Sequence, residues 1–292
     1  ILDYDDPADP LALHKAALVL TGIIPRVPNR GISSVFGGYG KGLELSTKVN
    51  VPKGSGLGTS SILAGTIVIC LNSMLGRILS EHELFDQVLV LEQMLTTGGG
   101  WQDQIGGLTD GIKFVKSQPG IPQLPIYEPV ELSASVRERF DKQFVIVYTG
   151  LRRLAKRILR DIMGAYILRE RNVVNSLFEI QEIALLMRNA LREGDLALVG
   201  HLMKRHWEIN KRMDPYSTNA IIDKIFEVCE PYVFGAKLCG AGGGGFMELI
   251  LKDEITIDQL NKVLKNAFPS GQVSVWPSSV AYRALKCETS TV

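Results

Sequence analysis

Hydrophobic and polar positions follow two different periods along the chain, which predicts a mixture of helices and strands. Apolar residues recur at helical spacing near the start, where helices are expected at 8–20, 60–75 and 80–96. Ser80 and Glu83 have the S-x-x-E spacing of a capping box, which predicts the start of the third of these helices. Later amphipathic segments predict helices at about 151–171, 173–193, 196–213, 218–229 and 258–268.

Strands are expected where apolar and polar residues alternate, or where short apolar runs are bounded by turn residues. The predicted strands are 43–51, 111–116, 144–148 and 273–276, with a strand, glycine loop and strand over 237–251. Helices and strands do not alternate strictly, which favours an α+β fold over a doubly wound sheet. Residues 117–135 hold four prolines and no helical period. We place the domain junction there, between lobes at 1–128 and 136–292.

Length and charge narrow the function classes. The chain has 292 residues, enough for one large domain or two ordinary ones. Lys and Arg number 32 against 31 Asp and Glu, so no global field attracts nucleic acid or an anionic membrane, and neither partner is expected. No apolar run is long enough to span a bilayer and no leader pattern opens the chain, so no signal peptide is expected.

Cysteine and histidine positions offer little metal chemistry. Four dispersed cysteines form no CxxC pair, so neither a zinc site nor a disulfide framework is expected, and a reducing cytoplasmic location fits best. His201 and His206 lie near one helical face. We interpret them as solvated or hydrogen-bonded side chains rather than metal ligands.

Glycine is abundant, 29 residues, and clustered. A first glycine-rich loop, residues 52–59, follows a predicted strand and precedes a predicted helix, which suits a phosphate group held by backbone N–H groups and a helix N-terminus. The hydroxyls of Thr59, Ser60 and Ser61 could cap the helix or reach a magnesium ion. The alternative is a plain strand-to-helix turn, and no Walker A motif occurs.

Two further constellations carry candidate chemistry. Glu92 lies beside the apolar face of its predicted helix, where a carboxylate needs a cation or a donor. Asp103 follows three glycines in a second glycine-rich loop, predicted over 98–107, which could direct its side chain into a cleft; a solvated Glu92 and a turn Asp103 are the alternatives. Residues 240–245 spell G-x-G-x-x-G, but a strand rather than a helix follows them, which argues against a dinucleotide fold.

Together these elements resemble the GHMP small-molecule kinases, a family that includes galactokinase, homoserine kinase and mevalonate kinase. Residues 51–61 look like its second motif, P-x-x-x-G-L-G-[ST]-S, and residues 240–245 look like its third, G-A-G-G-G-G. Within the family, residues 56–65 and 98–104 are most similar to the L-fucose kinases, with support from the segments that begin at Tyr148 and Arg153. The family's first motif is not in the sequence, so we expect an N-terminally truncated kinase domain.

The resemblance implies a two-lobed fold, with an N-terminal lobe like domain 2 of ribosomal protein S5 and a ferredoxin-like C-terminal lobe. It implies ATP and magnesium as cofactors and a sugar as substrate. The ATP-binding residues that it implies are Lys53, Gly54, Ser55, Gly56, Leu57, Gly58, Thr59, Ser60, Gly240, Ala241, Gly242, Gly243 and Gly244. Ser60 and Glu92 match the magnesium-binding residues of the family, and Asp103 matches its catalytic aspartate.

The implied reaction is phosphorylation of the anomeric hydroxyl of L-fucose, which gives L-fucose 1-phosphate. Two alternatives stay open: a kinase for another sugar such as a heptose phosphate, or a catalytically silent sugar- or nucleotide-binding relative. A nucleic-acid-binding protein on an S5-like fold finds no support in the charge balance.

Overall fold

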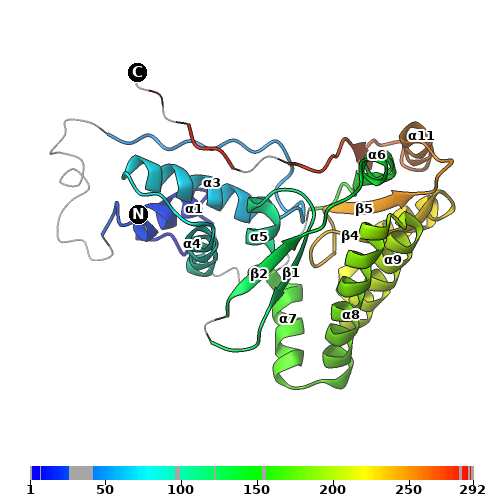
Figure 1. Ribbon diagram of the computed structural model, residues 1–292, viewed down its shortest axis with the longest axis horizontal. Helices are drawn as coiled ribbons and strands as arrows, with labels where there is room; N and C mark the ends of the chain where they lie inside the picture. Colours follow the sequence, from blue (N-terminus) through cyan, green and yellow to red (C-terminus); the bar gives the residue numbers. More distant parts are fainter. Residues whose placement is uncertain are drawn as a thin grey trace. The chain divides into compact units, whose positions relative to one another are not determined.

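The computed structural model describes residues 2–6, 8–25, 42–95, 99–121, 123–152, 156–282, 285–288 and 290 (Figure 1). Contacts divide the chain into two compact units. The first unit comprises residues 1–50, 58–110 and 283–292, and the second unit comprises 51–57 and 111–282. The segment 51–57 therefore belongs to the second unit although both of its neighbours along the chain belong to the first. Compact units and family domains are different divisions, so the lobes at 1–128 and 136–292 stay predictions.

Helices α1 (Ala12–Leu20), α3 (Thr59–Met74), α4 (Glu81–Met94) and α5 (Gln102–Leu108) build the described part of the first unit. Their apolar faces supply its buried side chains: Ala16, Ala17, Val19, Ala64, Ile67, Val68, Leu71, Leu84, Phe85, Val88, Leu91, Ile105 and Leu108. The predicted capping box is confirmed, because Ser80 Oγ accepts from Glu83 N while Glu83 Oε2 accepts from Ser80 N.

The strand predicted at 43–51 is wrong. Residues 42–50 are described, and they belong to no strand. Leu43 and Leu45 are half-buried between exposed neighbours, so the alternation does mark one sheltered side. A strand also needs a backbone partner, and no described segment pairs with this one.

The glycine loop predicted at 98–107 is wrong in its second half, where α5 begins at Gln102. Residues 106 and 107 are glycines inside this helix, and at Gly107 the reason is that the helix packs closely on α3. A Cβ atom at Gly107 would lie 2.5 Å from Ile62 Cγ1, and a Cβ at Gly65 would touch the Leu108 side chain. The glycines here permit close helix packing rather than a loop.

A four-stranded antiparallel sheet organises the second unit. The order of its strands is β4 (Val233–Leu238), β5 (Phe246–Leu251), β3 (Phe144–Tyr148) and β6 (Ser274–Trp276). Strand β3, from the middle of the chain, thus pairs with β5 and β6, which come from its last fifth. The strands predicted at 144–148, 237–251 and 273–276 are confirmed, although β4 begins earlier, at Val233.

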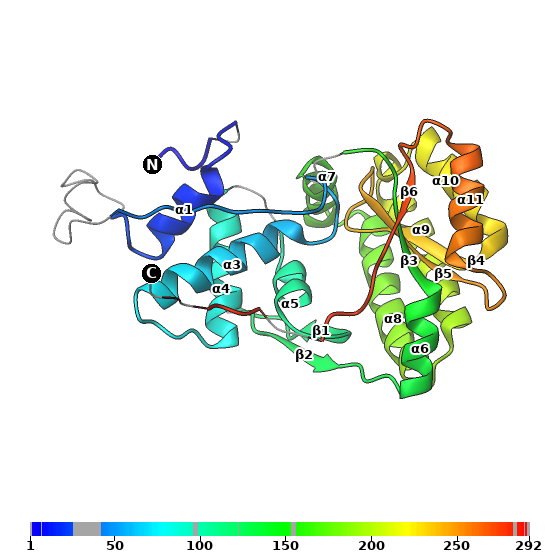
Figure 2. The same cartoon turned by 90° about the horizontal axis from the view of Figure 1, so that it is seen from above.

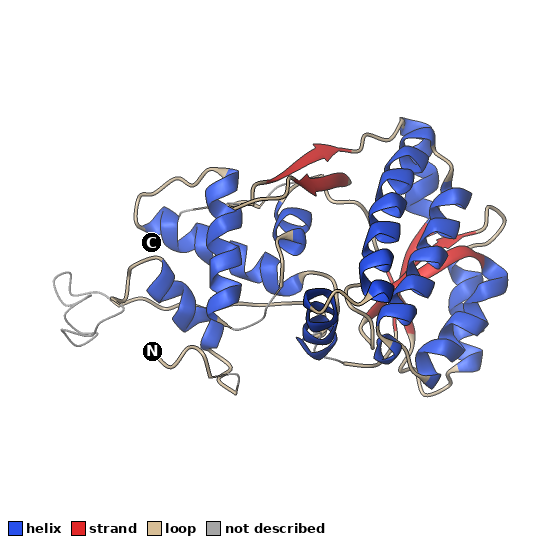
Figure 3. Ribbon diagram, turned by 90° about the horizontal axis from the view of Figure 1, so that it is seen from below, coloured by secondary structure: helices blue, strands red, loops and turns tan. Residues whose placement is uncertain are grey.

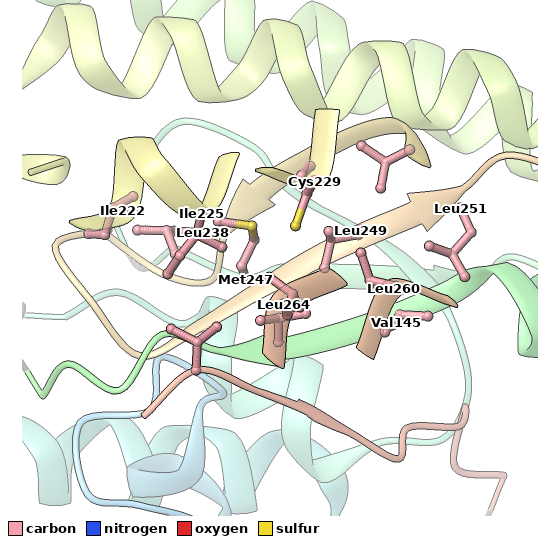
Figure 4. Close-up of a cluster of buried hydrophobic side chains, with 14 of the residues drawn as sticks. Val145, Ile222, Ile225, Cys229, Leu238, Met247, Leu249, Leu251, Leu260 and Leu264 are labelled. Atoms are coloured by element: carbon pink, nitrogen blue, oxygen red, sulfur yellow. The ribbon is translucent and has the colours of Figure 1, made fainter. Parts of the chain in front are cut away.

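Helices cover both faces of this sheet (Figures 2 and 3). On one face, α10 (Ala220–Cys229) and α11 (Ile257–Ala267) bury Ile222, Ile225, Leu260 and Leu264 against Met247 and Leu249 of β5 (Figure 4). Ile250 points to the opposite face, where it joins a core formed by α8 (Arg171–Glu193), α9 (Leu196–Met213) and α6 (Ala134–Gln143). Helix α7 (Lys156–Ile167) precedes α8, and short 3-10 turns η1 (Pro215–Ser217) and η2 (Glu230–Tyr232) flank α10.

A separate antiparallel hairpin, β1 (Lys113–Ser117) and β2 (Pro125–Pro129), also belongs to the second unit. Strand β1 was predicted, but β2 lies in the proline-rich stretch where no element was expected. Proline residues 125 and 129 stand at its two ends, positions where a strand tolerates a residue without an N–H group.

Helix α9 lies unusually close to β4. A Cβ atom at Gly235 would overlap the carbonyl of Gly200, so two glycines face each other at this contact. The same helix carries His206, and β4 carries Lys237, whose Nζ lies 2.8 Å from Glu248 Oε1. Burial, with a smaller contribution from the Lys237 charge, lowers the pKa of His206 to about 4.

This histidine predicts an acid-sensitive step in stability. The unfolded chain binds a proton at His206 near pH 6.5 and the folded chain only near pH 4, so stability falls as the pH drops through that window. We expect His206→Gln to flatten the fall of Tm between pH 6.5 and 5, measured by thermal unfolding in low salt. The exposed His82, changed to Gln, is the control and should keep the wild-type slope. Equal slopes in all three proteins would contradict this assignment.

No helix in the described residues has the length and apolar character needed to cross a bilayer.

Candidate functional site

Helix α3 begins at a glycine rather than at a capping side chain. Gly58 is the N-cap residue, with φ 64°, and it has no side chain with which to cap the first turn. The space that a Cβ atom would occupy at Gly58 borders Asp103, whose Cγ atom lies 3.5 Å away. The Asp103 side chain therefore lies against the amino end of a 16-residue helix.

Glu92 lies at the meeting point of three helices of the first unit. Its side chain belongs to α4 and is buried, with 6% of the residue's surface exposed. Ser61 Oγ, from α3, donates to Glu92 Oε1 at 2.8 Å, and Gln104 Nε2, from α5, donates to Glu92 Oε2 at 2.5 Å. Ser60 also hydrogen-bonds the Glu92 side chain, so the predicted magnesium pair, Ser60 and Glu92, is brought together.

Both carboxyl groups are less acidic than usual. Burial raises the pKa of Glu92, and the nearby charge of Asp103 adds to the rise, while the bonds from Ser61, Ser60 and Gln104 oppose it. Burial also raises the pKa of Asp103, although its side chain keeps access to solvent. Two carboxylates close together in a partly desolvated place favour a cation between or beside them.

This donor set fits magnesium. Carboxylate and hydroxyl oxygens are the hard ligands that Mg²⁺ takes in proteins, and it usually binds through one or two carboxylates and substrate phosphates. Within the described ranges no group of three or more His, Cys, Asp or Glu side chains is placed to hold a metal. A magnesium ion here would therefore depend on Glu92, Ser60 and the phosphates of a bound nucleotide.

The two glycine loops of the second unit are in backbone contact. Phe246 N donates to the Ser55 carbonyl oxygen at 2.9 Å. Gly245, with φ 82°, makes this approach possible, because a Cβ atom there would lie 2.3 Å from the Ser55 oxygen. A Cβ atom at Gly56 would likewise lie 2.7 Å from the carbonyl oxygen of Cys239.

Neighbouring protein groups hold part of the C-terminal glycine loop. Gly243 N donates to the Ser217 carbonyl oxygen at 2.5 Å, and Gly245 N donates to that of Leu151 at 2.9 Å. These amides shape the loop. Ser217 is almost fully buried, and its hydroxyl has no hydrogen-bond partner.

The other predicted residues lie where the loops put them. In the second unit, Lys53 is exposed, Ser55 is buried and Leu57 N approaches Ser55 Oγ at 3.4 Å. Left-handed backbone occurs at Gly54, Gly56, Gly58, Gly240, Gly242 and Gly243, and Gly244 has φ 152° beside Leu151. Ala241 is half-buried, Thr59 is the first residue of α3 and Ser60 is exposed. Gly98 and the segment that begins at Arg153 lie outside the described residues.

Sequence reasoning missed the two side chains that hold Glu92. Ser61 was a candidate cap or metal ligand, and Gln104 had no assigned role. Gln104 is completely buried. The sequence does hold a signal for Gln104. It follows Asp103 directly, and it lies on the helix face that also carries the apolar residues Ile105 and Leu108.

Two parts of the sequence match the domains of one known protein family. Residues 28–111 match the GHMP kinases N terminal domain, and residues 187–270 match the GHMP kinases C terminal domain. This chain belongs to the GHMP kinase family. The GHMP kinase motifs at 51–61 and 240–245 are thus the two loops that the structure brings into contact.

Among curated GHMP kinases, the chain is 40% identical over 257 residues to the bifunctional fucokinase/GDP-fucose pyrophosphorylase of Arabidopsis thaliana. That match covers 88% of this chain and 24% of the relative. It is 34% identical to the L-fucokinase/L-fucose-1-P guanylyltransferase of Bacteroides fragilis, over 92% of this chain and 29% of the relative. The chain thus spans 24% and 29% of the length of these two relatives.

More distant GHMP kinases support the fold. The D-glycero-alpha-D-manno-heptose 7-phosphate kinase of Campylobacter jejuni is 26% identical, over 70% of this chain and 59% of that protein. The crystal structure of Lactococcus lactis galactokinase matches 98% of this chain and 79% of its own, with a TM-score of 0.65 and 17% identity.

The loop contact gives a stability prediction. Gly245→Ala should destabilise the protein through its left-handed backbone, about 1–2 kcal/mol, and through overlap with the Ser55 carbonyl, about 1–3 kcal/mol more. Gly271→Ala is the matched control, since Gly271 has φ 72° and no atom within 4 Å of the added Cβ. Denaturant unfolding measures both. A Gly245→Ala variant no less stable than the Gly271→Ala variant would show that the contact is not tight.

Proposed function

We propose that this chain carries the sugar-kinase activity of a longer protein and transfers the γ-phosphoryl group of ATP to the anomeric hydroxyl of L-fucose. The observation that carries the proposal is Asp103 against the amino end of α3, beside the Glu92 network. Support for the substrate comes from two relatives whose names include fucokinase, at 40% and 34% identity over most of this chain. In this reaction the sugar oxygen bonds to the γ-phosphorus, and the bond from that phosphorus to the bridging oxygen of ADP breaks.

The loop over residues 54–60 is proposed to hold the ATP phosphates. Its glycines allow backbone N–H groups to approach a ligand, and Gly58 leads directly into α3, whose first N–H groups and positive dipole end favour phosphate. Residues 240–244 are proposed to contribute to nucleotide binding as well, because Gly240 lies beside Gly56 of the first loop. Lys53, exposed at the start of the first loop, adds a positive charge.

Ser60 and Glu92 are proposed to hold the magnesium ion. When bound, that ion neutralises charge on the phosphate oxygens and helps to fix their position. Burial prepares Glu92 for this role, because its carboxylate lies in a poorly solvated place where a cation stabilises the charged form.

Asp103 is proposed to orient the attacking hydroxyl and accept its proton. Its carboxylate lies beside the helix start at Gly58, and burial raises its pKa, which makes it a better proton acceptor than an ordinary aspartate. A cytoplasmic location is part of the same proposal, and it is supported by four cysteines that all carry free thiols.

A kinase for a heptose phosphate is the second candidate, because the Campylobacter jejuni heptose 7-phosphate kinase is 26% identical over 70% of this chain. A substrate panel separates the two. With the full-length protein and a coupled ADP assay, we expect kcat/KM for L-fucose to exceed that for D-glycero-D-manno-heptose 7-phosphate at least tenfold. The reverse ranking would assign the heptose phosphate instead. Turnover with neither sugar above the ATP-only rate would contradict both.

Removing the proposed base should abolish the chemistry and spare nucleotide binding. Asp103→Asn keeps the size of the side chain but removes its charge and basicity. We expect a loss of at least about 100-fold in kcat with L-fucose. The ATP affinity measured by calorimetry should stay within about twofold. Asp110→Asn, at an exposed position shortly after α5, is the control and should keep wild-type turnover. Turnover within twofold of wild type in Asp103→Asn would rule out this role.

A further inference from the structure

The hydrogen bonds around Glu92 assign a role to Gln104, a residue for which the family resemblance implies none. We infer that Gln104 is a positioning residue that, together with Ser61, fixes both carboxylate oxygens of Glu92 so that they face a magnesium ion in one orientation. This inference rests on the proposed function, because it concerns the metal site of the same reaction.

Each oxygen of Glu92 has its own donor, and the two donors come from different helices. Ser61 Oγ donates to Oε1 at 2.8 Å from α3, and Gln104 Nε2 donates to Oε2 at 2.5 Å from α5. Both donors are buried, with 1% of Ser61 and none of Gln104 exposed. The carboxylate is therefore held at both ends and cannot rotate about its last torsion without breaking one of these bonds.

The arrangement is costly to the fold, which argues for a function. A carboxylate is buried among helices whose neighbouring positions hold Leu91 and Ile105, and replacing buried charged groups by apolar ones is often neutral or stabilising. The amide of Gln104 adds a second cost. Its Oε1 atom is buried and has no hydrogen-bond partner among the described residues, which typically costs about 1–3 kcal/mol.

The amide orientation follows from the charge of Glu92. Turning the amide over would place Oε1 where Nε2 now lies. Two acceptors, Gln104 Oε1 and Glu92 Oε2, would then face each other. Gln104 thus leaves its own acceptor unsatisfied in order to donate to Glu92. A residue that served packing alone would need neither group.

Fixing a ligand in advance mainly affects metal affinity. Groups that orient a metal ligand typically contribute about 10–100-fold to affinity or activity when removed. Ser60 and Asp103 are unchanged when Gln104 is replaced, so the reacting groups remain. The structure therefore predicts that loss of Gln104 raises the magnesium concentration needed for half-activity, with little change in kcat at saturating magnesium.

The test replaces Gln104 by Met, which has similar length and no N–H donor. The exposed Gln102 of the same helix, changed to Met, is the matched control. Binding is measured without turnover, by electron paramagnetic resonance of Mn²⁺ titrated into full-length protein with ADP. We expect the Mn²⁺ dissociation constant to rise about tenfold in Gln104→Met and to stay within twofold in Gln102→Met.

Kinetics supply the second readout. In Gln104→Met the magnesium concentration for half-activity should rise about tenfold, while kcat at saturating magnesium and KM for L-fucose stay within about threefold. Ser61→Ala, a smaller change, removes the other donor and should act in the same direction. It also stands in for Gln104→Met if that variant does not fold.

The outcomes separate the inference from the function beneath it. Wild-type Mn²⁺ binding with unchanged binding in both variants would overturn the positioning role and leave the kinase proposal intact. A wild-type protein that binds no Mn²⁺ with ADP would overturn the metal site itself, and the positioning role with it. A fall in kcat at saturating magnesium with unchanged Mn²⁺ affinity would show that Gln104 acts on the chemistry or the fold instead.

Discussion

The hydrogen bond from Phe246 N to the Ser55 carbonyl oxygen is the constraint on which the candidate phosphate loop depends. It exists only because residue 245 has no Cβ atom, so the start of β5 can approach an early segment of the chain. Residues 51–57 therefore pack as part of the second unit. The next residue, Gly58, is the N-cap of α3, a helix of the first unit. The peptide bond between residues 57 and 58 joins the two. The loop before it is held by contact with the start of β5, and the helix after it is packed within the first unit. A substitution in either glycine loop should therefore disturb the backbone contact between the loops directly, whether or not a ligand is bound.

A second constraint is the buried carboxylate of Glu92, a side-chain group rather than a backbone contact. The hydrophobic packing of α3, α4 and α5 places this carboxylate where water is scarce, and its pKa rises. Hydrogen bonds from Ser61 and Gln104 offset part of that cost, since bonds to charged groups contribute about 1.5–3 kcal/mol each. The remaining preference for a cation is what a metal site needs. If Glu92 holds magnesium as proposed, stability and function compete here, because the buried carboxylate makes the core less favourable while its direction is fixed.

Local signals in the sequence predicted local structure well. The capping box at Ser80 and the short apolar run at 144–148 gave elements that the structure confirms, because these signals act within a few residues. The family motifs marked both glycine loops, but the backbone contact between them is a tertiary feature that periodicity could not supply. Strand β2 escaped prediction because its pairing with β1 is a tertiary event, and the prolines at its ends hid it.

Glycine explains the misplaced loop at 98–107 and the missed partner of Glu92 together. At 245 glycine serves a left-handed backbone, whereas at 107 it serves an ordinary helix packed against Ile62. Composition does not distinguish these two uses. Because 106 and 107 looked like loop residues, the helix around them was not predicted, and the inward direction of Gln104 could not be derived. Side-chain direction follows from the element, so an error in the element hides the contact.

The chemistry proposed for Asp103 depends on which of two opposing effects is larger. The amino end of α3 carries a partial positive charge that favours an ionised carboxylate and would lower its pKa. Burial acts in the opposite direction, because it disfavours the charged form and raises the pKa of Asp103. A phosphate bound at the same helix end would cancel part of the helix's positive charge and add negative charge of its own. Both changes raise the proton affinity of Asp103 further. The carboxylate would thus become a stronger base only when the phosphoryl donor is in place, which links proton removal from the sugar to the presence of ATP.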